Sequence, residues 1–138
     1  MELPTIISSF QRITCLGGLI NIQRFATLTN ISAHTIRYYE KIGVLKHIAR
    51  NANGHRFFTS KDIDWIQFVK RLKKMGMPLD NIKLYADLRE QGESTAEQRK
   101  ELLQDHAVLL EEKIVLEALH LKKIKEKIIY YENVINKN

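Results

Sequence analysis

Residues 31–43, ISAHTIRYYEKIG, gather side chains that could recognise a partner molecule. Within eight positions stand a histidine, a threonine, an arginine, two adjacent tyrosines, a glutamate and a lysine. Ser32 can cap a helix and Gly43 can end it, so the stretch predicts one short helix. A solvated helix face rarely carries two adjacent tyrosines, and a core helix would not carry His34, Thr35 and Arg37 beside them. We therefore expect this helix to meet another surface.

The side-chain sets that enzymes use are not visible. There are no paired carboxylates, no nucleophile spaced from a base, no Gly-rich phosphate loop and no metal cluster. Cys15 is the single cysteine, which excludes an internal disulfide and favours a reducing cytoplasm. His106 and His120 could bind a metal across a dimer, but ordinary positions on a helix are the favoured interpretation. We expect no enzyme activity, no metal and no cofactor.

Positive charge is concentrated in the first half of the chain. Residues 1–76 carry 12 Lys or Arg against four Asp or Glu, whereas residues 77–138 carry 10 against 12. Such a basic half favours nucleic acid as its partner, although charge alone fits an anionic membrane surface equally well. No apolar run approaches the roughly 18 residues that span a bilayer. Residues 1–19 are interpreted as an N-terminal extension ahead of the true domain, for which disorder and an origin in an upstream start codon are both considered.

A helix-turn-helix and a hairpin would position the opening stretch. Residues 21–29 have helical apolar spacing and connect through a short turn to the helix of residues 32–43. Val44-Leu45 and Phe57-Phe58 then flank a polar tip at residues 51–54, and its Asn-Gly pair predicts a two-stranded hairpin, or wing. An ordinary surface turn is the alternative. A third helix, capped by Thr59 or Ser60, and a fourth, starting at Pro78, complete a predicted domain over residues 20–92.

The last segment, residues 93–138, predicts one long helix with an apolar stripe. Steps of four and three residues connect Leu103, Ala107, Leu110, Ile114, Glu117, Leu121, Ile124, Ile128, Tyr131 and Ile135. Such a stripe is typical of a coiled coil, and the small preceding domain cannot cover all of it. We therefore predict a homodimer whose interface includes Leu103, Leu110, Ile114, Leu121, Ile124 and Ile128, and an all-α fold with a small β-hairpin wing.

Three motifs in this order carry a family resemblance. They are TIRYYEKIGVL, then GHRFFT, then DIDWIQFVKRLKKMGMPLDNIK. Over about residues 20–89 the chain resembles the DNA-binding domain of the MerR family of bacterial transcription regulators, and within it the small NmlR/AdhR-like branch. The resemblance implies a winged helix-turn-helix with a second helical wing, an antiparallel dimer of the long helices, and a pseudo-palindromic promoter whose over-long spacer is distorted for RNA polymerase.

The resemblance also implies roles for individual side chains. In the second helix we expect His34, Thr35 and Arg37 to reach base edges or adjacent phosphates, and Tyr38 to place its hydroxyl on a phosphate, while Ile36 and Tyr39 pack in the core. Arg24 is either a backbone contact or a solvated arginine. The wing candidates are Asn53, Gly54, His55 and Arg56, with His55 replacing the usual aromatic residue. The second-wing candidates are Lys70, Arg71 and Lys74.

The residues that family members use to sense a signal are missing from this sequence. Family members that sense metals use cysteines around the dimer helix, and aldehyde-responsive relatives use a cysteine near the segment that here reads FVKRLKKMGM. Neither is present, although the resemblance implies stress or aldehyde-detoxification target genes. Two further hypotheses stay open: a coiled-coil adaptor whose basic head binds RNA, a membrane or a protein, and an enzyme.

Overall fold

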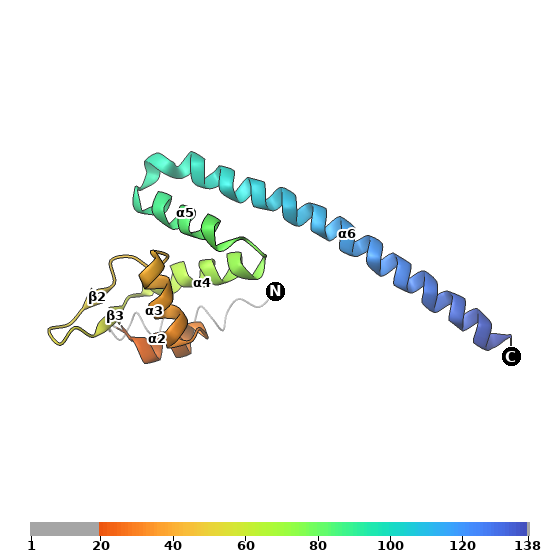
Figure 1. Cartoon of the computed structure of the whole chain (residues 1–138), viewed down its shortest axis with the longest axis horizontal. Helices are drawn as coiled ribbons and strands as arrows, with labels where there is room; N and C mark the ends of the chain where they lie inside the picture. The colour runs from red at the N-terminus through yellow and green to blue at the C-terminus, as the bar shows by residue number, and fades with distance from the viewer. Residues whose placement is uncertain (1–19, 138) are drawn as a thin grey trace. The chain divides into compact units, whose positions relative to one another are not determined.

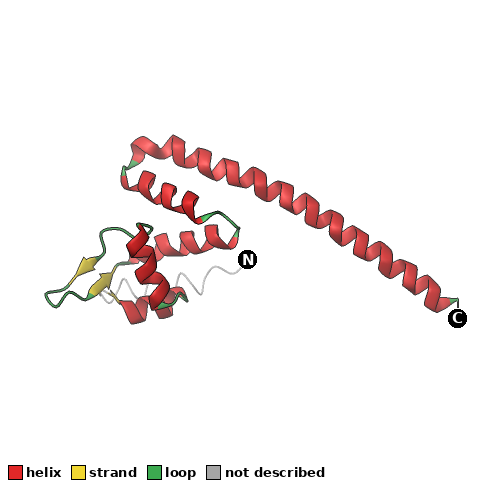
Figure 2. Ribbon diagram, in the orientation of Figure 1, coloured by secondary structure: helices red, strands yellow, loops and turns green. Residues whose placement is uncertain are grey.

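The computed structural model describes residues 20–137 and divides the chain into two compact units, Met1–Ala96 and Glu97–Asn138. The first unit, called the head below, holds helices and a small sheet, and the second holds most of one long helix (Figures 1 and 2). The predicted fold class, helical with a small β wing and a long C-terminal helix, is confirmed. The predictions for residues 1–19, Cys15 included, fall outside the described residues.

The predicted helix-turn-helix consists of α2 (Ile22–Thr29) and α3 (Ala33–Ile42). The Asn21 side chain caps α2 by accepting a hydrogen bond from the Arg24 backbone N–H at 2.8 Å. Asn30 then ends α2 in the left-handed conformation, with φ 55°, which asparagine tolerates. Ser32 caps α3 through the Thr35 N–H at 3.1 Å, as its sequence position predicts.

The wing has three strands, whereas the sequence predicted two. Strand β3 (Arg56–Phe58) pairs antiparallel with β2 (Ala49–Arg50) on one side and with β1 (Ile20–Asn21) on the other. Val44 and Leu45 belong to no strand; both donate N–H bonds to the Tyr39 carbonyl and bury their side chains behind the end of α3. These apolar residues therefore serve the core, and the first hairpin strand begins four residues later, at Ala49.

The core joins the sheet to the helices. The rings of Phe25 from α2 and Phe58 from β3 stack with centroids 4.0 Å apart, and both are fully buried. Helix α4 (Ser60–Lys74) begins with a capping box between Thr59 and Asp62. It buries Ile63, Trp65, Ile66, Val69 and Leu72, while Phe68 is only half-buried.

Helix α5 (Leu79–Glu90) follows Pro78, which occupies the cap position rather than the first turn. A short 3-10 turn, η1 (Glu93–Thr95), leads to α6 (Ala96–Asn136), a helix of 41 residues. The predicted stripe lies on α6, and in this single copy Leu121, Ile124 and Ile128 are each about half exposed. A second group of exposed apolar residues, which the sequence analysis did not identify, includes Val108, Val115 and Leu119. No helix within residues 20–137 is long and apolar enough to cross a membrane.

Candidate nucleic-acid interface

Helix α3 presents a polar face and buries the opposite one. Ile36 is fully buried and Tyr39 is 6% exposed, as predicted, whereas Tyr38 is 44% exposed. Burial, and then the neighbouring Tyr38, raises the pKa of Tyr39, so its hydroxyl stays protonated. His34 and Arg37 are exposed, and Thr35 is half-buried beside the Ser32 cap. One tyrosine of the pair is therefore a core residue, and the other is available to a partner.

A groove of about 480 Å³ lies between α3, the start of α2 and the hairpin. It brings together Arg37, Gly54, His55 and Arg56, all predicted from the sequence, although they come from separate elements. It also contains residues that the sequence analysis missed, namely Asn21, Ile22, Gln23, Asn51 and Phe57. No acidic residue of the described chain lines it. The positive end of α2 and three basic side chains therefore converge on one surface.

The tip of the hairpin is built around one side chain. Asn51 Oδ1 accepts hydrogen bonds from the backbone N–H groups of Asn53, at 3.0 Å, and His55, at 2.9 Å. Gly54 has φ 80°, a left-handed conformation that glycine adopts without steric cost. The exposed side chains of Asn53 and His55 are thus held on an ordered turn.

Arg56 and Lys70 have partners within the chain. Arg56 Nε donates to Glu40 Oε1 at 2.8 Å, and Arg50 Nη2 donates to the same oxygen at 3.0 Å. Lys70 Nζ donates to the backbone carbonyl of Thr29 at 2.9 Å. The resemblance implied DNA contacts for both Arg56 and Lys70, whereas the structure shows that each also joins two elements of the head.

The remaining candidates lie on exposed helical positions. Arg71 and Lys74 line a shallow depression of α4 together with Gln67 and Lys70. Arg24 is exposed on α2, one position beyond the α2 residues that line the groove. The structure therefore brings together Arg37, Gly54, His55 and Arg56 around the groove and Lys70, Arg71 and Lys74 at the end of α4. The other predicted residues line neither surface: Arg24, His34, Thr35, Tyr38 and Asn53.

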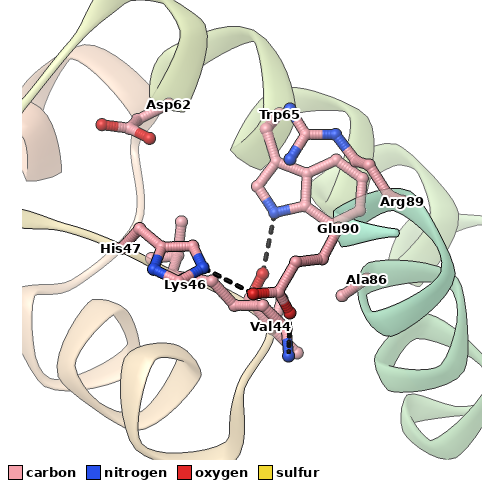
Figure 3. Close-up of a pocket in the computed structure, with 9 residues that line it drawn as sticks. Val44, Lys46, His47, Asp62, Trp65, Ala86, Arg89 and Glu90 are labelled. Atoms are coloured by element: carbon pink, nitrogen blue, oxygen red, sulfur yellow. Dashed lines mark hydrogen bonds and ion pairs between the residues drawn. The ribbon is translucent and has the colours of Figure 1, made fainter. Parts of the chain in front are cut away.

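A second cleft, of about 400 Å³, lies between the α3–β2 connection, α4 and α5 (Figure 3). Lys46 Nζ is 2.6 Å from Asp87 and 3.1 Å from Glu90, and these partners raise its pKa. His47 Nε2 lies 2.5 Å from Glu90, and the bonds from His47 and then Lys46 lower the pKa of that carboxyl. Because its acids and bases neutralise each other, this cleft lacks the unbalanced positive charge of the groove.

Two further contacts at this cleft join α4 to the α3–β2 connection and to α5. Trp65 Nε1 donates to the Val44 carbonyl at 2.8 Å, and the Arg89 guanidinium lies 4.4 Å from the centre of the Trp65 indole ring. His47 has φ 57°, an uncommon conformation for a non-glycine residue. Within residues 20–137, no group of three or more His, Cys, Asp or Glu side chains is placed to hold a metal ion.

Known proteins resemble this arrangement. The model of the MerR HTH family regulatory proteins matches residues 20–88, and a second model, MerR, DNA binding, matches residues 63–123. An HTH-type transcriptional regulator of Haemophilus influenzae is 33% identical over 102 residues, which span 74% of this chain and 76% of the relative. The chain belongs to the MerR family.

Relatives within the MerR family agree in sequence and in structure. The regulator AdhR of Bacillus subtilis is 34% identical over 86 residues, which span 62% of this chain and 61% of AdhR. The crystal structure of HiNmlR, a MerR family regulator lacking the sensor domain and bound to promoter DNA, superposes with a TM-score of 0.75 at 30% identity, covering 84% of this chain and 92% of HiNmlR. A MerR family structure from Listeria monocytogenes gives a TM-score of 0.78 at 34% identity, covering 82% and 86% of the two chains.

This MerR family member is a DNA-binding transcriptional regulator. The relatives are transcriptional regulators, which confirms the expectation that the chain is not an enzyme.

Proposed function

We propose that this MerR family regulator binds a pseudo-palindromic promoter as a homodimer and places the groove between α3 and the hairpin on the DNA. The observation that carries this proposal is the convergence of Arg37, His55 and Arg56 with the start of α2 around one groove. Side chains from three elements can meet a duplex together only if the fold holds them side by side. HiNmlR, a structural relative, was crystallised bound to promoter DNA, which supports DNA as the partner of this head.

In the proposed complex, α3 enters the major groove. His34, Thr35 and Arg37 contact base edges or adjacent phosphates, and Tyr38 directs its hydroxyl to a phosphate. From the hairpin, the DNA backbone is contacted by Asn53, Gly54, His55 and the Nη groups of Arg56. Arg71 and Lys74 add phosphate contacts from α4, and Arg24 adds one from α2. Lys70 contributes its charge to this group while it remains bonded to Thr29.

The second copy of the chain is proposed to pair with α6. Half-exposed apolar residues repeat along the predicted stripe of that helix, and an antiparallel partner would cover them. The interface would include Leu103, Leu110, Ile114, Leu121, Ile124 and Ile128. Two heads joined by paired rods would require two DNA half-sites at a set spacing. We propose the domain division at residues 20–92 and 93–138 on the same basis.

The regulatory consequence follows from that geometry. Two heads that each hold the backbone at several points can bend and untwist the spacer between promoter elements, so that RNA polymerase engages both. This action takes place in the cytoplasm. The resemblance to the NmlR/AdhR-like branch supports promoters of stress or aldehyde-detoxification genes as targets.

A mobility shift with the DNA directly upstream of the gene tests this proposal. We expect a single dyad-symmetric site, and an affinity whose logarithm falls with the logarithm of salt concentration with a slope of about −6 or steeper, because several phosphates are neutralised per head. A scrambled duplex of the same composition is the control. Equal affinity for the two duplexes would overturn sequence-specific binding and favour the adaptor hypothesis.

A further inference from the structure

Glu40 is the one acidic residue of α3, the helix proposed to enter the DNA groove. A carboxylate on that helix repels phosphates, so by charge alone it should weaken binding. The sequence analysis assigned Glu40 no role.

The contacts of Glu40 lead to both strands of the hairpin. Its Oε1 accepts from Arg56 Nε of β3 at 2.8 Å and from Arg50 Nη2 of β2 at 3.0 Å. Arg50 Nη1 also donates to the Gly54 carbonyl at 3.1 Å, which extends the network to the tip of the hairpin. Within residues 20–137, every hydrogen bond and ion pair between α3 and the two hairpin strands passes through this carboxylate.

The network is shielded enough to fix geometry. The side chains of Glu40 and Arg56 are 21% and 25% exposed, so they are less hydrated than an ordinary surface pair. Hydrogen bonds between ionised groups are the shorter and stronger ones. Two guanidinium groups also outweigh one carboxylate, so the cluster keeps a net positive charge toward the DNA.

The hairpin is otherwise attached mainly at its base. There β3 pairs with β1, and Phe58 stacks on Phe25, well behind the tip. Those contacts lie at the root of the hairpin, and none of them includes α3. Because the groove takes Arg37 from α3 and His55 from the hairpin, its width depends on the angle between these two elements.

We propose that Glu40 is a positioning residue for DNA binding. Its carboxylate holds the hairpin at the angle to α3 at which both elements reach one duplex. The inference rests on the proposed DNA-binding groove. By this inference Glu40 increases the affinity for DNA, whereas its negative charge alone would decrease it. The two effects have opposite signs, so a binding measurement can distinguish them.

The first experiment compares the full chain with Glu40→Gln by amide hydrogen exchange without DNA. We expect the hairpin amides of Asn51 and Gly54, which are hydrogen-bonded across the turn, to exchange faster in the variant. Amides of α5, remote from Glu40 in the sequence, should exchange as in the wild type. The variant Asp64→Asn, the same chemical change at an exposed position of α4, serves as the matched control. Unchanged hairpin exchange in Glu40→Gln would overturn the inference.

The second experiment measures binding to a duplex that the wild-type chain selects from a random-sequence library. Glu40→Gln should weaken that binding roughly tenfold, since charge-assisted hydrogen bonds are lost, whereas simple removal of repulsion would strengthen it. Arg56→Met and the double variant complete a cycle, in which the double variant should lose little more than Arg56→Met alone.

Tighter or unchanged binding by Glu40→Gln, or fully additive losses, would refute the positioning role. If the wild-type chain selects no sequence at all, the proposed promoter binding fails, and the exchange measurement still decides whether Glu40 orients the hairpin.

Discussion

The ammonium group of Lys70 donates to the backbone carbonyl of Thr29 at 2.9 Å, which joins the C-terminal part of α4 to the last residue of α2. A cation at that position also interacts favourably with the negative end of the α2 dipole. Lys70 is therefore a structural residue of the helix-turn-helix, whatever charge it also offers to DNA. The side chain of Lys74, on the same helix, is exposed, and no hydrogen bond or ion pair joins it to another described residue.

Replacing these two lysines by methionine should separate the two roles. Lys70→Met should lower the free energy of unfolding by about 1–2 kcal/mol, since a charge-assisted hydrogen bond to a buried residue is lost. Lys74→Met should leave that free energy within about 0.5 kcal/mol of the wild-type value. It should reduce the magnitude of the slope of log affinity against log salt concentration by about 1. Denaturant unfolding and a salt titration measure the two quantities. Equal stability losses would contradict the assignment.

Arg37 should determine sequence preference. Arg37→Ala is expected to weaken binding to the preferred duplex by about 1–3 kcal/mol while it affects a scrambled duplex much less, because a base contact is lost. Lys41→Ala, which removes an exposed cation in the last turn of the same helix, is the matched control and should weaken both duplexes alike. Competition titrations with the two duplexes measure the ratio. A uniform loss for Arg37→Ala would mean that it contacts phosphates alone.

The dimer prediction can be tested by two leucine substitutions on α6. Leu121 belongs to the stripe, whereas Leu119, two positions earlier, points about 160° away around the helix. The two side chains are similarly exposed, at 52% and 48%. Leu121→Lys should shift the chain toward monomers by tenfold or more in dimer dissociation constant, because a charge would be buried in the pair. Leu119→Lys should shift it much less.

Sedimentation at micromolar concentration measures this difference. A wild-type chain that sediments as a monomer would rule out the dimer, and an equal effect of both substitutions would place the interface elsewhere on α6.

The stabilisation from the contacts of Glu90 with Lys46 and His47 should be lost in acid. Its pKa is lowered in the folded chain, so the folded state binds a proton less readily than the unfolded state, whose reference pKa is 4.5. The stabilisation is therefore complete above that value and is lost as the pH falls through the lower, folded pKa. The difference in unfolding free energy between wild type and Glu90→Gln should shrink over that acidic range.

Urea titrations across that pH range measure the difference. In a His47→Ala background the difference should already be smaller, because the hydrogen bond from His47 is the first cause of the shift. A difference that does not change with pH would show that Glu90 acts through packing alone.

Local patterns were sufficient to predict the helices but not the contacts between them. Ser32, Gly43 and the Asn-Gly pair act on neighbouring backbone, so their effects could be predicted from the sequence. Strand β1 has only two residues, too few to show an alternating pattern, and it forms only because β3 lies beside it.

The two intramolecular roles of basic residues were missed for a related reason. Glu40 meets partners 10 and 16 positions away, and Lys70 meets Thr29 across 41 positions. No periodicity or cap signal encodes such a pairing, so each basic residue looked like a DNA contact. A net excess of positive charge favoured nucleic acid but fitted an anionic membrane surface equally well, and it could not distinguish cations that contact a ligand from cations that hold elements together.

The half-exposed apolar stripe of α6 also has a consequence for gene dosage. If only paired copies grip a promoter, then at low abundance the active species grows with the square of the number of chains. Halving synthesis would leave about a quarter of it, so the response of the target genes would be steeper than the change in supply. A twofold dilution during growth would thus lower the amount of paired protein about fourfold, without any chemical signal reaching the protein.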